Sequence, residues 1–135
     1  MSRLISILSV GVLTVFVAPL TALSPGTDVL VPGAALVSDW RTDLYILNPG
    51  EYTANVTVML LVRDQANPSP ESQNFVIPPG ETAVLENVLG DTFGKTSFSG
   101  AIRVTSDQGV VVNSRIFNLR DGVTFGQGYE GIPRD

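Results

Sequence analysis

The chain has 135 residues with neither cysteine nor histidine, and its 8 basic and 13 acidic residues give a net charge of −5. It therefore lacks the usual general base at neutral pH, a thiol nucleophile and the commonest zinc ligands. The acidic balance, without any basic run, argues against nucleic acid or an anionic membrane surface as a partner.

Residues 1–22 differ from the rest of the chain, because Arg3 is their only charge and a mainly apolar run follows over 4–17. That run has the length of a secretory h-region and is shorter than the roughly 20 residues that span a bilayer. We predict a signal peptide over 1–22, with cleavage after Ala22. A retained short membrane anchor is the alternative.

Export would leave 113 residues (135 − 22), enough for one domain with a single core and no membrane span. The expected location is extracellular, on the cell surface or in the periplasm. An exported chain without disulfides must be stabilised by its core alone, which is more typical of a bacterial protein than of a small animal secreted domain.

The first two predicted elements differ in strength. Residues 23–37 contain two prolines and two glycines, so we expect an extended segment with one or two brief edge strands. Residues 41–48 form a strand with apolar positions on both faces, and Asn48-Pro49-Gly50 ends it.

Further short strands are predicted along the rest of the chain. Residues 55–63 place Val56, Val58, Leu60 and Val62 on one face, and a proline-containing loop over 64–74 is expected to join two sheets. Strands over 75–77 and 82–86 precede about one helical turn within 87–93.

The last predicted strands are 100–105 and 110–119, joined by a tight hairpin at Ser106–Gly109, and 123–125 after an Asp-Gly turn. About seven short strands with frequent turns and almost no helix predict an all-β fold, an antiparallel β-sandwich over residues 38–133.

Several segments together resemble a β-sandwich module of exported bacterial proteins, many of them uncharacterised. They are Trp40–Gly50 (WRTDLYILNPG), Pro79–Thr82, Val88–Leu89, Phe93–Gly94, Gly100–Asp107, Val110–Asn118 and Gly126–Gln127. The resemblance implies an immunoglobulin-like fold and a surface or secreted location, and it supplies no catalytic residues. In such proteins a second sandwich often follows, so we expect either a free-standing module or a piece of a longer chain.

Acidic residues offer two chemical alternatives. Asp39 and Asp43 on one extended strand would be roughly 13 Å apart, too far for a glycosidase carboxylate pair. Calcium needs only oxygen-rich loops, and Asp39, Asp43, Asp107 and Asp121 lie at predicted loops or strand ends. The spacing of a calcium loop is missing, so ordinary turn chemistry is the preferred interpretation and no cofactor is predicted.

Four charges inside apolar strands are candidate surface residues: Arg41, Asp43, Arg103 and Arg115. An unpaired buried charge is costly, so we expect them to face outward or to pair across strands. A pair between Asp43 and Arg103 or Arg115 would contribute about 0.2 to 1 kcal/mol. The alternative is that the same residues form a polar binding patch on one sheet face.

Aromatic residues offer a second candidate surface. Trp40, Tyr45, Tyr52 and Tyr129 could stack against sugar rings, but tryptophan at a strand start is typical of a core plug in a sandwich. Tyr52 in a turn and Tyr129 in a glycine-rich tail are the expected exposed pair.

These observations favour a non-catalytic, exported module with a structural or adhesive role at the cell surface, bound to a protein or a surface glycan. The first alternative is a self-assembling filament subunit, in which Val29–Val37 adds as a strand to a neighbouring copy. A more distant alternative is a domain that binds or hydrolyses glycans.

Overall fold

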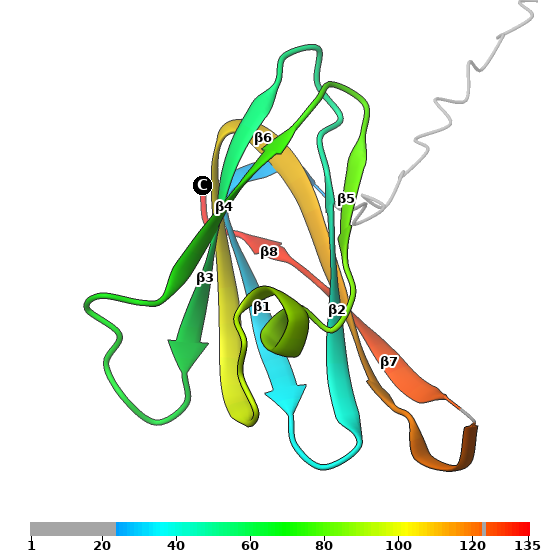
Figure 1. Cartoon of the computed structure of the whole chain (residues 1–135). Coiled ribbons are helices and arrows are strands. Elements are labelled where there is room, and N and C mark those ends of the chain that lie inside the picture. The colour runs from blue at the N-terminus through cyan, green and yellow to red at the C-terminus, as the bar shows by residue number, and fades with distance from the viewer. Residues whose placement is uncertain (1–23, 123) are drawn as a thin grey trace, which may run out of the picture.

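A computed structural model describes residues 24–122 and 124–135 (Figure 1). The predicted signal peptide over 1–22 lies outside the described residues. Within the described part, eight strands and two short helical turns follow one another. They are β1 (Gly26–Leu36), β2 (Trp40–Leu47), β3 (Ala54–Val62), β4 (Ser72–Ile77), β5 (Thr82–Leu85), η1 (Val88–Thr92), β6 (Phe98–Asn118), η2 (Arg120–Gly122), β7 (Phe125–Glu130) and β8 (Ile132–Pro133).

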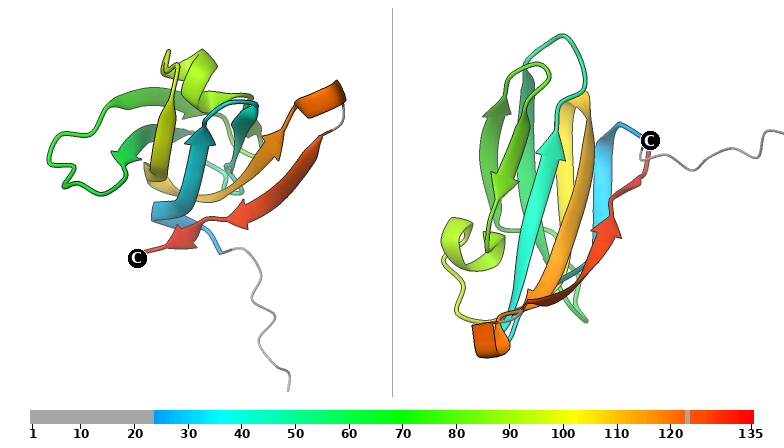
Figure 2. Two further views of the ribbon diagram at one scale, coloured as in Figure 1. Left: turned by 90° about the horizontal axis from the view of Figure 1, so that it is seen from below. Right: turned by 90° about the vertical axis from the view of Figure 1, so that its right-hand side faces the viewer.

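Two antiparallel sheets share the long strand β6. Its first half pairs with β1 and β3 in a sheet ordered β4-β3-β6-β1-β8, here called sheet A. Its second half pairs with β2 and β7 in a sheet ordered β5-β2-β6-β7, here called sheet B. Figure 2 shows β6 crossing the molecule between the two sets of partners. The predicted all-β antiparallel sandwich is confirmed, with eight described strands instead of about seven.

The predicted hairpin at Ser106–Gly109 is wrong, because the chain continues through it as one 21-residue strand. The register explains how. Gly26 pairs with Val110 while Asp28 pairs with Thr105, so β6 has extra residues between these two pairs. They form a bulge where β6 passes from sheet A to sheet B. The side chain of Asp107 accepts hydrogen bonds from the backbone and amide nitrogens of Asn55 at 2.8 and 2.7 Å, which ties this bulge to β3.

The segment before Trp40 forms a much longer strand than expected. β1 has 11 residues and lies between β6 and β8, with Val29, Val31, Ala34 and Leu36 buried. A register shift between Val31 and Ala34 accommodates the proline and glycine that were expected to interrupt the ladder. β1 therefore pairs with β6 along most of its length and with β8 at Val29 and Leu30.

The alternation predicted for the third strand is largely confirmed. Val56, Val58 and Leu60 are buried, whereas Val62, at the end of β3, is 41% exposed. The loop after β3 leads to β4, which pairs with β3 itself. The expectation that this loop joins two sheets is therefore wrong.

The single helical turn predicted within 87–93 is confirmed as η1, which packs against β2 and β1. Asn87 precedes it in the left-handed region at φ 44°, and Val88 and Leu89 are fully buried. The core lies between the two sheets, formed by the inward side chains of β1, β2, β3 and β6 together with this turn.

Candidate functional site

Two aromatic side chains flank a hollow at one end of sheet B. Trp40 on β2, Asn118 on β6 and Phe125 on β7 pair in register, so the three residues form one row across the sheet. Trp40 is 41% exposed and Phe125 is 67% exposed. They line a hollow of about 490 Å³ together with Asn118, Arg120 and Asp121, here called the aromatic hollow.

A smaller hollow continues along the same face of β7. Its volume is about 290 Å³, and Trp40 and Phe125 again lie on its walls, now with Ile116, Gln127 and Tyr129. Phe125, Gln127 and Tyr129 alternate with glycines, so they share one face of β7. The exposed surface therefore runs from Trp40 to Tyr129.

The end of sheet A explains why this face is open. Thr42, two residues after Trp40 on the same face of β2, is buried beneath β1, and its hydroxyl hydrogen-bonds with both the backbone N–H and the C=O of Ala35 at 2.9 Å. Between β1 and β2 the chain makes a tight turn, in which the Trp40 N–H donates to the Val37 carbonyl at 2.9 Å. Sheet A therefore ends before the row formed by Trp40, Asn118 and Phe125, and does not cover it. The prediction that Trp40 plugs the core is therefore wrong.

Polar groups border the aromatic rings. The backbone N–H of Arg120 donates to the Asn118 side-chain oxygen at 2.8 Å, which orients that amide at the hollow. Arg120 and Asp121 lie in η2, where Asp121 adopts φ 58° to turn the chain toward β7. The hollow thus combines flat apolar rings with amide, guanidinium and carboxylate groups.

The outer face of sheet B brings together three of the predicted charged residues. Arg41, Asp43 and Arg115 line a hollow of about 350 Å³ beside η1. Asp43 is only 8% exposed and accepts a hydrogen bond from the Asn87 backbone N–H at 2.8 Å. Burial, with the nearby Asp43 charge, raises the pKa of Tyr45.

The predicted cross-strand ion pair of Asp43 is wrong. Arg115 is its register partner on β6, yet the Arg115 guanidinium donates to the Thr124 hydroxyl at 3.2 Å and lies 5.0 Å from the Phe117 ring centre. Arg41 donates to the carbonyl of Ser38 in the preceding turn and to that of its neighbour Trp40. Asp43 instead holds the start of η1, which is a structural use of the charge.

The fourth predicted charge lies on the other sheet. Arg103 forms a double hydrogen bond with Asp28 on β1, at 2.9 and 2.8 Å. These bonds lower the pKa of the Asp28 carboxyl and raise the pKa of the Arg103 guanidinium. Arg103 therefore lines none of these three hollows of sheet B.

The Asp28–Arg103 pair predicts a pH-dependent stability. Since the folded-state pKa of Asp28 is lowered, its stabilisation is present above the unfolded pKa near 4 and is lost as pH falls through the lower folded value. We expect Asp28→Asn to lose about 1 kcal/mol at pH 7 and less below pH ~4, measured by urea unfolding. Asp64→Asn, which removes a highly exposed pair with Arg63, should change stability at neither pH. Equal losses in both variants at pH 7 would contradict this role of Asp28.

The predicted exposed tyrosines do not meet. Tyr52 is 72% exposed in the loop between β2 and β3, whereas Tyr129 is half-buried on β7 beside the aromatic hollow. The sequence prediction missed Phe125, which was assigned only to a final strand. Its signal was the alternation of aromatic and glutamine residues with glycines after the Asp-Gly turn.

Of the aspartates considered for calcium, Asp39 lies in the turn before β2, and the others lie on three different elements. Asp43 lies within β2, Asp107 within β6 and Asp121 in η2. Across residues 24–122 and 124–135, there is no group of three or more acidic side chains that could hold a metal ion. Asp43 holds the start of η1, Asp107 ties the β6 bulge to β3, and Asp121 turns the chain toward β7.

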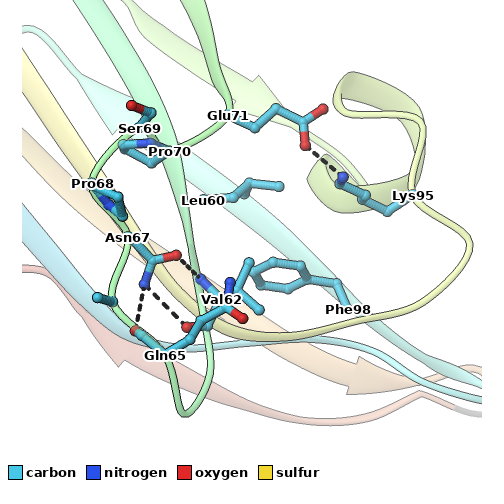
Figure 3. Close-up of a pocket in the computed structure, with 11 residues that line it drawn as sticks. Leu60, Val62, Gln65, Asn67, Pro68, Ser69, Pro70, Glu71, Lys95 and Phe98 are labelled. Atoms are coloured by element: carbon cyan, nitrogen blue, oxygen red, sulfur yellow. Dashed lines mark hydrogen bonds and ion pairs between the residues drawn. The ribbon is translucent and has the colours of Figure 1, made fainter.

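The loop between β3 and β4 encloses a further hollow of about 210 Å³ (Figure 3). Leu60 and Phe98 point into it, and Glu71 and Lys95 form an ion pair at its rim. The Asn67 side chain exchanges hydrogen bonds with both backbone groups of Val62 at 2.8 and 3.1 Å. The amide is thus used to hold the loop, and we assign this small hollow to loop packing.

The fold is similar to that of two solved proteins. Thermotoga maritima 1070, known from a crystal structure, aligns with a TM-score of 0.70 at 16% identity, over 82% of this chain and 96% of that one. The Anabaena sensory rhodopsin transducer aligns with a TM-score of 0.53 at 19% identity, over 69% of this chain and 99% of that one. Identities this low show a shared fold alone.

No family model and no curated protein matches the chain. The resemblance to exported bacterial modules therefore stays a prediction. Among the helices of the described residues, none is long and apolar enough to cross a membrane.

Proposed function

We propose that the chain is a non-catalytic, exported β-sandwich module that acts in adhesion by holding a sugar ring of a surface glycan in the aromatic hollow. The carrying observation is the pair of exposed rings, Trp40 and Phe125, placed in one row across sheet B. Exposed aromatic side chains gathered at one place are typical of a binding surface, whereas scattered ones are not.

The chemistry of the hollow suits a carbohydrate. A sugar ring presents C–H groups on its faces and hydroxyls at its edges, and it needs flat apolar rings flanked by polar groups. Trp40 and Phe125 supply the rings, while Asn118, Arg120 and Asp121 supply donors and acceptors. The volume of about 490 Å³ is within the range of small-ligand sites.

The remaining parts of the proposal rest on the sequence. A chain with neither histidine nor cysteine lacks the residues that most hydrolytic mechanisms use, which supports a binding role. The mainly apolar run over 4–17 supports export. Mass spectrometry of the protein recovered from producing cells tests export, with a new N-terminus near Leu23 expected.

Strand addition by Val29–Val37 has less support than the glycan proposal. β1 already pairs with β6 along most of its length and with β8 at Val29 and Leu30. Donation to a neighbouring copy would require these pairs to be exchanged.

A glycan array followed by calorimetry tests the aromatic hollow. We expect wild-type protein to bind a subset of glycans with or without calcium, and Trp40→Ala and Phe125→Ala to weaken binding at least about tenfold, equivalent to about 1.4 kcal/mol. Phe125 is 67% exposed, so Phe125→Ala should keep a near wild-type melting temperature, whereas Trp40 is 41% exposed and Trp40→Ala should melt lower. Circular dichroism at the assay temperature checks that both variants are folded when binding is measured.

Tyr52→Ala is the matched control, since this ring is 72% exposed and lines neither hollow on this face. It should bind as wild type does. An array without signal for the wild-type protein, or equal affinity of wild type and Trp40→Ala, would overturn the glycan proposal.

A further inference from the structure

β7 carries a free backbone edge beside the aromatic hollow. On one side it pairs with β6 from Asn113–Glu130 to Asn118–Phe125, and no described strand pairs with its other side. In Figure 1, β7 diverges from the body of the sandwich toward η2. Unpaired edges are templates for further strands, and proteins usually blunt them with lysine, proline or a bulge. β7 contains no lysine or proline and pairs without a register shift.

Backbone hydrogen bonds fix which groups of β7 face outward. Gly131 N–H donates to the Val112 carbonyl at 2.8 Å, and Leu119 N–H donates to the Asp39 carbonyl at 3.1 Å. Even-numbered residues of this half of β6 therefore bond toward β7, and odd-numbered ones toward β2. The odd-numbered residues of β7 lie opposite the even-numbered residues of β6 and bond to them. The even-numbered residues of β7 therefore direct their N–H and C=O groups to the free edge. These outward residues are Gly126, Gly128 and Glu130.

We propose that a second copy of this chain pairs with the free edge of β7, antiparallel and across a two-fold axis at Gly128. In this register, Gly128 pairs with Gly128 of the other copy, and Gly126 pairs with Glu130. Glu130 is the only charge on β7, so each carboxylate lies opposite a glycine and the two carboxylates lie at opposite ends. The charge pattern therefore permits self-pairing without like charges in contact.

The pairing has a consequence for the aromatic hollow. An antiparallel pair across this axis keeps the same faces of both sheets on one side, so the two hollows would open in the same direction. If the proposed function holds, the dimer presents two sugar sites on one surface and gains avidity on a dense glycan layer. The dimer itself rests on the edge of β7 alone.

Sedimentation velocity of the purified chain, from about 1 µM to about 1 mM, tests the dimer over the range of weak interfaces. We expect the average mass of wild type to approach twice the monomer mass. Gly128→Pro removes the central outward N–H and should remain monomeric. Gly128→Ala retains that N–H, and its added β-carbon would lie 3.8 Å from the nearest atom, so it should dimerise as wild type does. A monomeric wild type at every concentration, or a dimeric Gly128→Pro, would overturn the proposal.

Amide exchange of wild-type protein gives a readout that depends on no variant. The amides of Gln127 and Tyr129, bonded to β6, should be protected at all concentrations. Those of Gly128 and Glu130 should become at least about tenfold more protected as the dimer fills. Equal protection at low and high concentration would contradict edge pairing, whatever the fold of the variants.

The two proposals fail separately. A monovalent sugar should bind Gly128→Pro and wild type with equal affinity in solution, since Gly128 lines neither hollow. Only the signal on a dense array should fall, by about tenfold or more. A wild-type protein that stays monomeric at every concentration but binds sugar would refute only the edge pairing. A dimer that binds no sugar would refute only the proposed function.

Discussion

Replacement of Gly100 by alanine should destabilise the protein by about 3 kcal/mol or more, through a clash between two strands of sheet A. A β-carbon at position 100 would lie 2.0 Å from the backbone carbonyl oxygen of Leu61 on β3 and 3.0 Å from the Phe98 ring. The carbonyl belongs to the backbone and cannot rotate away as a side-chain end could. Urea unfolding followed by circular dichroism measures the loss as a lower midpoint.

Gly33→Ala is the control for the Gly100 variant. Gly33 also lies within a strand, but a β-carbon there would be 3.6 Å from its nearest neighbour, the Ile116 side chain, which is ordinary contact. We expect a change within about 1 kcal/mol and of either sign, because alanine also restricts the unfolded chain. Equal midpoints for the two variants would show that β3 and β6 do not approach closely at Gly100.

Local patterns were sufficient to predict several inner strands, but not the length of β1 and β7, the presence of β8 or the connections between strands. The alternation of Val56, Val58 and Leu60 correctly indicated one buried face, because the period of a strand acts residue by residue. The polar run Ser106–Gly109 looked like a hairpin, yet it forms a bulge within one strand. A turn and a bulge use the same residue types, and only distant partners, β1 and Asn55, distinguish them here.

The aromatic hollow depends on long-range pairing in the same way. Trp40 and Phe125 are 85 residues apart in sequence, and they meet only because β2 and β7 both pair with β6. Sequence patterns identify an aromatic residue at a strand start, but not where the opposite sheet ends. The end of the opposite sheet is set by the length and position of β1. The two prolines in this segment did not indicate so long a strand.

Asn48 was predicted only as part of the turn that ends the strand over 41–48, but its side chain holds the following loop to the end of β4. Its side chain is fully buried at the end of β2. The amide nitrogen donates to the carbonyls of Tyr52 and Ile77 at 2.7 and 3.0 Å, and the amide oxygen accepts from Gly50 N–H at 3.1 Å. One amide thus holds the loop from β2 to β3 and fastens it to the end of β4.

Asn48→Ala should destabilise the protein by about 3 kcal/mol, since three hydrogen bonds are lost and the buried Ile77 carbonyl loses a partner. Chemical denaturation at pH 7 measures the change. Asn74→Ala is the control, because its exposed side chain makes a single hydrogen bond to Thr57 on β3 and should contribute less than about 1 kcal/mol. A loss below about 1 kcal/mol in Asn48→Ala would show that water or a relaxed loop replaces the amide.

Asn48→Asp separates the loss of donors from the loss of side-chain volume, because aspartate has nearly the shape of asparagine. At pH 7 its carboxylate would face two carbonyl oxygens in a buried site, so we expect it to be at least as unstable as Asn48→Ala. Such surroundings raise the folded-state pKa above the unfolded value, so the variant should recover stability relative to wild type as pH falls, when the protonated acid can donate one bond. A stability difference from wild type that stays constant from pH 7 to about pH 4 would mean that the two carbonyls do not depend on a donor at this position.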